Sequence, residues 1–228
     1  MFCRSIDRSI ARSTVSHRKM SGGKEAYLVV YNAGMTILSL LSAASVVFTL
    51  LNRGLGKVWE GAGDIFLLSQ GLSLLEVANA ALGVSRSSPG TAFAQWVGKA
   101  NVLVGILFLI PELRNTAATA VLFLAWGVSE TVRFYYYLLT IVMGKGVPEQ
   151  LTYVRYTLFI PLYPIGMLAE LRLMWLALGT DALASLGAGY HCFTWGLARV
   201  YPLLWLPLYL HMFKQRRKKL FPKKAKGT

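Results

Sequence analysis

The sequence contains few charged residues and very few acidic ones. Of its 228 residues only 15% are charged, and 10 are Asp or Glu, whereas soluble domains are about 25% charged. Hydrophobic residues make up 55% of the chain, and the mean hydropathy is +0.49. This composition excludes an ordinary soluble domain and indicates a membrane protein, whose length allows a single domain.

Cysteine, histidine and the motifs of nucleotide or metal chemistry are also scarce. The two cysteines, Cys3 and Cys192, form no disulfide framework, and the three histidines are scattered. The sequence has no Gly-rich phosphate loop, no zinc-ligand spacing, no nucleophile elbow and no internal repeat. We therefore expect neither a metal nor another cofactor.

Apolar runs instead recur along the whole chain, each close to the ~20 residues that a membrane-spanning helix needs. Gln95 and Lys99 interrupt the third run. Arg199, Pro202 and Pro207 predict a last run that is bent or partly interfacial. The predicted fold is an all-α bundle of six transmembrane helices. The six predicted spans are 26–51, 65–84, 91–110, 117–143, 153–178 and 193–213.

Positive charge is concentrated at the two ends of the chain. Lys and Arg number 24, and the formal net charge is +14. Because positive segments stay on the cytosolic side, we expect both termini in the cytosol, which requires an even number of spans. The predicted divisions are a disordered basic tail (1–25), a membrane domain (26–213) and a second basic tail (214–228). Both tails are expected to contact lipid headgroups, and nucleic-acid binding is not expected, since no basic–aromatic module stands between them.

Each tail also carries a pattern that is typical of a targeting signal. Lys224 and Lys226 lie five and three positions from the C-terminus; this matches a dilysine signal for retrieval to the endoplasmic reticulum, with chance as its competitor in a lysine-rich tail. Residues 1–20 are rich in Arg and Ser, which is typical of a mitochondrial transit peptide. The alternatives are a disordered cytosolic tail and an extension upstream of a translation start at Met20, which leads directly into the first span.

Tyr163 and Glu170 are the most informative polar residues inside an apolar run. Seven residues of helix place them on nearly the same face, about 10 Å apart along the axis. Glu170 is expected at membrane depth, where an ionisable group is expensive and is by default a functional candidate. Arg155 falls on a similar face nearer the membrane surface. Pro161 and Pro164 can loosen the helix around the tyrosine, although a tyrosine in a span is often only a packing residue.

Further polar residues in the predicted spans gather at mid-depth or toward the cytosol. They suggest a polar cavity open to the cytosol or, alternatively, structural links between helices. In the structural alternative Glu130 pairs with Arg133, and Glu76 pairs with Lys99. The candidate substrate-binding residues are Arg155, Lys99, Glu130, Arg133, Glu76 and Asn79.

Several separate blocks, in the right order, carry a resemblance to a known family. The blocks are 27–32 (YLVVYN), Leu75-Glu76 with Gly83, 91–95 (TAFAQ), 126–136 (WGVSETVRFYY) and 155–166 (RYTLFIPLYPIG). In these blocks the chain resembles the very-long-chain (3R)-3-hydroxyacyl-CoA dehydratases, also called protein-tyrosine-phosphatase-like membrane proteins. The resemblance implies six spans, residence in the endoplasmic reticulum, and Tyr163 and Glu170 as the catalytic pair. It also implies the third step of fatty-acid elongation, with the other enzymes of that cycle as possible partners.

The sequence departs from the family pattern at two places. Asn79 stands where the family usually has a histidine, and Gly98-Lys99 replaces the usual Ser-Arg. Neither change touches the implied catalytic pair. They bear on hydrogen bonds in the cavity and on acyl chain-length preference, not on the reaction class.

The implied chemistry suits these residue types. Dehydration of a 3-hydroxyacyl-CoA removes a proton from C2 and hydroxide from C3, which requires a base and an acid. A carboxyl and a phenol can divide these roles in either order. The acyl chain would lie among apolar helices, and the CoA phosphates would meet Lys99, Arg155, Arg86 or Lys145. Two other classes stay open: an inactive membrane scaffold of the same fold and, with less support, a small transporter.

Overall fold

The computed structural model describes residues 22–85 and 87–221, apart from the side chain of Lys145, and this part of the chain is helical without a strand. Its longer helices are α2 (Gly22–Asn52), α3 (Val58–Ala81), α4 (Pro89–Ala100), α5 (Ala117–Met143), α6 (Glu149–Thr157), α7 (Phe159–Ala177) and α9 (Ala188–Leu220). The shorter elements are η1 (Leu55–Lys57), the π-helical η2 (Asn101–Phe108), η3 (Pro111–Leu113), η4 (Gly144–Gly146) and α8 (Asp181–Ser185). The predicted all-α class is confirmed.

Local sequence signals set several helix ends. Thr116 caps α5, because its hydroxyl oxygen accepts a hydrogen bond from the Thr119 N–H at 3.3 Å. Gly144 ends the same helix with a φ of 58°, a conformation that glycine adopts without steric cost. Thr180 caps α8 in the same way, accepting from the Leu183 N–H at 3.2 Å. These polar positions begin and end helices whose interiors are almost wholly apolar.

The predicted spans differ from the helices in four main respects. The predicted span 91–110 is divided after Ala100 into α4 and the π-helical η2. Helix α3 begins at Val58, before the predicted start at 65. The predicted span 153–178 is divided at Leu158 into α6 and α7. Pro161 accounts for this break, because it has no N–H to donate to the carbonyl of Thr157. Helix α9 continues to Leu220, so the first half of the predicted C-terminal tail is helical. The rest of that tail, with its dilysine pattern, and residues 1–21 lie outside the described residues.

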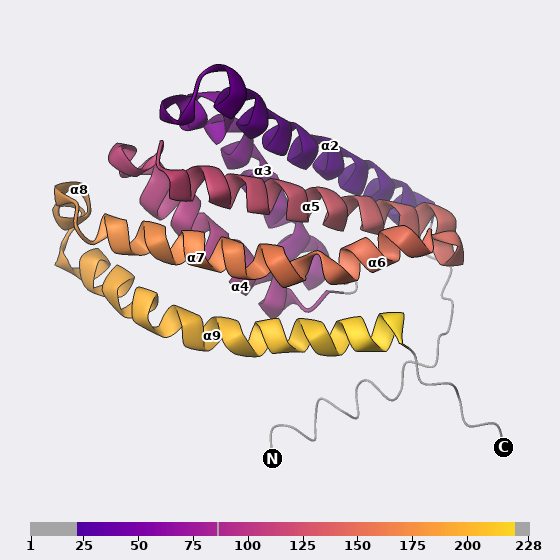
Figure 1. Ribbon diagram of the computed structural model, residues 1–228. Coiled ribbons are helices and arrows are strands. Elements are labelled where there is room, and N and C mark those ends of the chain that lie inside the picture. Colours follow the sequence, from indigo (N-terminus) through magenta and orange to yellow (C-terminus); the bar gives the residue numbers. More distant parts are fainter. Residues whose placement is uncertain (1–21, 86, 222–228) are drawn as a thin grey trace, which may run out of the picture.

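Helix α5 occupies the centre of the bundle. It packs against α2 on one side and α7 on the other, and α7 in turn packs against α9, which forms an outer edge (Figure 1). In the core, Phe123 of α5 stacks on Phe66 of α3 with ring centroids 4.1 Å apart. Gly127 lets α2 approach α5 closely, since a Cβ at this position would lie 2.8 Å from that of Ala43.

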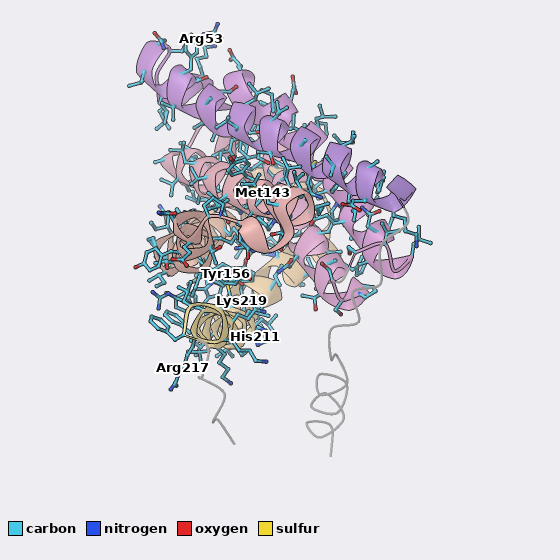
Figure 2. All side chains as sticks on the ribbon, turned by 90° about the vertical axis from the view of Figure 1, so that its right-hand side faces the viewer. Arg53, Met143, Tyr156, His211, Arg217 and Lys219 are labelled. Carbon is cyan, nitrogen blue, oxygen red and sulfur yellow. The ribbon has the colours of Figure 1, made fainter. Side chains whose placement is uncertain are left out.

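Within the part of the chain that the structure describes, three helical segments are long and apolar enough to cross a membrane: α2, α4 together with η2, and α6 together with α7. The count of six spans therefore stays a prediction. Helix α2 begins and α9 ends at the same end of the bundle (Figure 1), as an even number of crossings requires. Figure 2 looks onto this end, where Met143, Tyr156, Arg217 and Lys219 of α5, α6 and α9 are found. We call it the basic end.

The membrane topology can be tested by labelling both ends of the bundle. Epitopes at residues 1 and 228 should both be accessible to antibody after selective permeabilisation of the plasma membrane. A glycosylation acceptor inserted between α7 and α9 should be modified, because that link lies at the opposite end of the bundle. The same acceptor inserted between α5 and α6 is the control and should stay unmodified. Protection of either terminus would contradict the six-span arrangement.

Candidate active site

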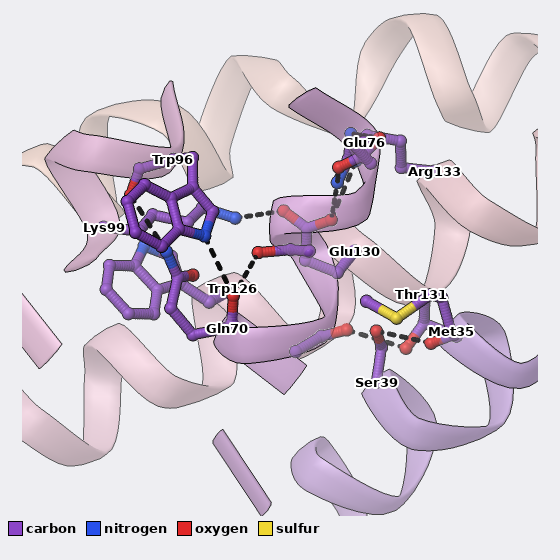
Figure 3. A network of polar contacts seen from close by, with 12 residues as sticks. Met35, Ser39, Gln70, Glu76, Trp96, Lys99, Trp126, Glu130, Thr131 and Arg133 are labelled. Carbon is purple, nitrogen blue, oxygen red and sulfur yellow. Dashed lines mark hydrogen bonds and ion pairs between the residues drawn. The ribbon is translucent and has the colours of Figure 1, made fainter. Parts of the chain in front are cut away.

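A chain of ion pairs joins the three helices α3, α4 and α5 (Figure 3). The two terminal nitrogens of Arg133 on α5 donate to both oxygens of Glu76 on α3, at 2.8 and 2.7 Å. Its Nε donates to Glu130 at 2.8 Å. The other oxygen of Glu130 pairs with Lys99 of α4. Two cations and two anions therefore neutralise one another, with 16% to 29% of each side chain exposed.

This arrangement confirms one predicted pair and corrects another. Glu130 pairs with Arg133 as the structural alternative predicted, but Glu76 pairs with Arg133 instead of Lys99. The physical reason is the guanidinium fork, which has enough donors for two carboxylates. Lys99 then pairs with Glu130 Oε1, the oxygen that Arg133 does not contact. These four candidate substrate-binding residues thus contact one another, as structural links between helices do.

Glu170 lies deeper in the bundle and is held by neutral donors. Its side chain is buried, with 9% exposed. The indole N–H of Trp126 on α5 donates to Glu170 Oε1 at 3.0 Å, and the hydroxyl of Tyr201 on α9 donates to Oε2. Both carboxyl oxygens therefore accept a hydrogen bond, and the residue links α5, α7 and α9.

Tyr163 is partly buried. It lies about two helical turns from Glu170 along α7, on the side of the basic end. Its ring stacks on Trp205 at a centroid distance of 5.3 Å and on Tyr209 at 5.8 Å, and both partners belong to α9. Tyr163 and Glu170 therefore both face α9, which agrees with the shared face predicted from their spacing. The structure contains no direct hydrogen bond between these two side chains.

The ion pairs and the Glu170 site are connected through Trp126. The ammonium group of Lys99 lies 5.5 Å from the centroid of the Trp126 ring, close enough for a cation–π interaction. The same ring donates its N–H to Glu170. The contacts thus form one continuous series: Glu76, Arg133, Glu130, Lys99, Trp126, Glu170 and Tyr201.

The remaining candidate residues lie outside this series. The guanidinium of Arg155 on α6 lies 5.8 Å from the ring of Tyr137 and 5.9 Å from that of Tyr156, toward the basic end. Asn79 is buried near the end of α3, where its main-chain carbonyl accepts hydrogen bonds from the N–H groups of Val84 and Ser85.

Two further predictions concern parts of the chain where the structure gives no test. Arg86 lies outside the described residues, as does the side chain of Lys145. Among the residues described, no cluster of three His, Cys, Asp or Glu could hold a metal ion.

Tyr201 and Trp126 are contacts of Glu170 that the sequence analysis did not assign. A signal for Tyr201 is present in the sequence, because Tyr201, Trp205 and Tyr209 recur every four residues and so share one face of α9. Trp126 lies four residues before Glu130 and so shares one face of α5 with it, but this spacing does not show that the indole reaches Glu170.

Comparison with known proteins identifies the family. The family "Protein tyrosine phosphatase-like protein, PTPLA" matches residues 70–222, which include α4, α5, α7 and α9. The chain belongs to this family. The match extends beyond the resembling segments of the sequence to the whole of α9, and so includes Tyr201.

Individual relatives match over most of their length. The very-long-chain (3R)-3-hydroxyacyl-CoA dehydratase hpo-8 of Caenorhabditis elegans is 30% identical over 85% of this chain and 94% of its own. The very-long-chain (3R)-3-hydroxyacyl-CoA dehydratase 2 of Mus musculus is 29% identical over 86% of this chain and 81% of its own length. The dehydratase 2 of Homo sapiens is 28% identical over 85% of this chain and 80% of its own length. No solved structure matches the chain significantly.

The structural role of the ion pairs predicts an effect on stability. Glu130→Ala leaves Lys99 without a carboxylate and Arg133 with only one. The free energy of unfolding should fall by about 3 kcal/mol, because breaking a buried pair leaves uncompensated charge. Thermal unfolding in detergent measures this effect.

Glu60→Ala is the control for this measurement. Glu60 pairs with Lys57 at 2.7 Å, but these side chains are 55% and 52% exposed, and such exposed pairs contribute about 0 to 1 kcal/mol. If Glu130→Ala removes activity and leaves the unfolding temperature unchanged, Glu130 belongs to the reacting site and the structural role is wrong.

Proposed function

We propose that this protein is a membrane lyase that dehydrates long-chain (3R)-3-hydroxyacyl-CoA to trans-2-enoyl-CoA in the fatty-acid elongation cycle. Its membership of the PTPLA family and its similarity to proteins named very-long-chain (3R)-3-hydroxyacyl-CoA dehydratases support the reaction class. The observation that carries the assignment to residues is the pair of hydrogen bonds to Glu170, with Tyr163 facing the same helix α9.

Glu170 is the base in this proposal. An ionised carboxylate only accepts hydrogen bonds, and both Glu170 oxygens accept one, from Trp126 and from Tyr201. Neutral donors orient the carboxylate without placing a counter-ion in its way, since Lys99 is paired with Glu130. In the reaction a Glu170 oxygen takes the proton from C2 of the substrate, and the electron pair of that C–H bond forms the C2–C3 double bond.

Tyr163 is the acid. As the C3–O bond breaks, the leaving hydroxide takes the phenolic proton of Tyr163 and departs as water. Glu170 then carries a proton and Tyr163 is a phenolate. The released water, while it lies between the two groups, accepts that proton from Glu170 and gives one to Tyr163. This restores the enzyme, and the net products are the enoyl thioester and one water molecule. The apolar helix faces around this pair keep bulk water from competing with the transfer.

The orientation of the substrate follows from the distribution of charge. Arg155 lies in the last turn of α6, and Arg216 lies near the C-terminal end of α9, where its Nε donates to the Thr157 hydroxyl at 3.3 Å. A CoA group arriving from the cytosol would place its phosphates near these cations and its acyl chain among the apolar helices. This requires six spans with both termini cytosolic. Residence in the endoplasmic reticulum and contact with the other elongation enzymes belong to the same proposal.

The retained pair of Tyr163 and Glu170 argues against a scaffold, because a protein without activity has no need of both. A transport pathway needs polar groups at every depth of the membrane. The four charged residues Glu76, Lys99, Glu130 and Arg133 instead pair with one another.

Removing either member of the proposed pair should abolish turnover. Tyr163→Phe and Glu170→Gln should each lower kcat by at least about 1,000-fold for a long-chain 3-hydroxyacyl-CoA, and the double variant should lose little more than the worse single one. Enoyl-CoA formation by purified protein is the measurement, with thermal unfolding as the check on folding.

Tyr190→Phe is the matched control, because its hydroxyl on α9 contacts Asn101 away from this pair. It should keep its activity. Near-normal turnover in either Tyr163→Phe or Glu170→Gln would refute the assignment.

A further inference from the structure

Three aromatic residues of α9 that carry a hydrogen-bond donor face α7, and only one of them has an unused donor. The hydroxyl of Tyr201 donates to Glu170, and that of Tyr209 donates to the carbonyl of Ile160 at 3.0 Å. Between them, one turn from each, lies Trp205. Its Nε1 atom is buried and has no hydrogen-bond partner among the described residues.

The surroundings of this indole are aromatic and well ordered by stacking. Trp205 stacks on Tyr163 with ring centroids 5.3 Å apart and planes inclined by 20°, and on Tyr209 at 4.5 Å and 21°. An indole N–H lies in the plane of its ring, so near-parallel stacking directs it away from the faces of both tyrosine rings. Neither neighbour can therefore act as a π acceptor for this N–H.

A buried donor without an acceptor is costly. The penalty is enough to make such groups rare in native proteins, and each one calls for an explanation. Two other buried side-chain atoms of the described residues share this state, Ser85 Oγ and Asn101 Nδ2, but neither residue contacts the proposed catalytic pair. Trp205 alone of the three packs directly against Tyr163.

We propose that the Trp205 N–H donates a hydrogen bond to the thioester carbonyl oxygen of the substrate, which makes Trp205 a further catalytic residue. This inference rests on the proposed dehydratase function. When Glu170 takes the C2 proton, negative charge develops on that oxygen, and a fixed donor in a water-poor site stabilises it strongly. No bond to the protein forms: the charge grows on the oxygen and then passes to the departing hydroxide, which Tyr163 protonates.

The other nearby donors are already engaged. Trp126 and Tyr201 both donate to Glu170, and Lys99 pairs with Glu130. Trp205 is one turn from Tyr201 and in contact with Tyr163, so a carbonyl held by its N–H would keep C2 and C3 beside the proposed base and acid. The acyl chain would then lie along the face of α9 that carries the Trp205 N–H.

The test removes the N–H and keeps the ring. Trp205→Phe preserves an aromatic stacking partner for Tyr163, and replacement of the indole by isosteric benzothiophene removes the donor alone. In both variants kcat should fall about 100- to 1,000-fold. The full-length protein in detergent is used throughout. Trp195→Phe on α9, an exposed ring under Arg199, is the control and should keep its activity.

A binding measurement separates this role from a merely structural one. The product enoyl-CoA should bind Trp205→Phe and the benzothiophene variant about 3- to 10-fold more weakly than the unmodified protein, because one hydrogen bond is lost. The thioether analogue, which lacks the carbonyl oxygen, should bind all three proteins equally. A variant with damaged folding would bind both the enoyl-CoA and the thioether analogue more weakly. If the benzothiophene variant binds both ligands more weakly, the proposal is overturned.

The outcomes for the two proposals differ. If the unmodified protein forms no enoyl-CoA, the dehydratase function fails, and this inference fails with it. If the unmodified protein is active and Glu170→Gln is not, but the benzothiophene variant turns over normally, the function stands and the role of Trp205 is wrong.

Discussion

The rest of the site depends on how the Glu170 carboxylate is held inside an apolar bundle. A charge at membrane depth is stable only where nearby groups satisfy it. Here the two donors come from different helices, Trp126 from α5 and Tyr201 from α9. The carboxylate therefore ties the outer helix α9 to the centre of the bundle, and any shift of α9 along α7 would break the hydrogen bond from Tyr201.

The ion pairs do not contact Glu170 directly and support its position through Trp126. They join α3, α4 and α5 through Glu76, Lys99, Glu130 and Arg133. By holding α5 in place and setting Lys99 near the ring of Trp126, they determine the direction of the indole that meets Glu170. Charges that form closed pairs suit this supporting role, because a rigid surrounding shell holds a reacting group in position. The reacting groups that we propose are then few and lie along α7 and α9.

Much of the fold follows from local patterns, and the site follows only in part. Apolar runs separated by polar links predicted the helices, and a spacing of seven placed Tyr163 and Glu170 on one face, which packing against α9 bears out. Pairing across helices was less predictable. Any of several acids and bases could meet at one depth, and the choice of Arg133 over Lys99 for Glu76 depends on guanidinium geometry.

The contribution of α9 could not be derived from its pattern alone. Pro202 and Pro207 predicted a bent helix, and α9 is curved while it stays one continuous helix from Ala188 to Leu220 (Figure 1). Its aromatic residues at intervals of four define a face, but a sequence does not say which neighbour that face meets. Only the packing of α9 on α7 turns Tyr201 into a donor to Glu170 and Trp205 into a partner of Tyr163.

The central claim is that Glu170 is the base that takes the C2 proton. The most direct test is a structure of the full chain bound to a saturated long-chain acyl-CoA, which lacks the C3 hydroxyl and cannot react. We predict that a Glu170 oxygen lies within about 3.5 Å of C2, the range of a near-attack geometry, while the CoA phosphates lie at the basic end. A complex in which C2 lies nearer the ion pairs of Glu76 and Glu130 than Glu170 would contradict this claim.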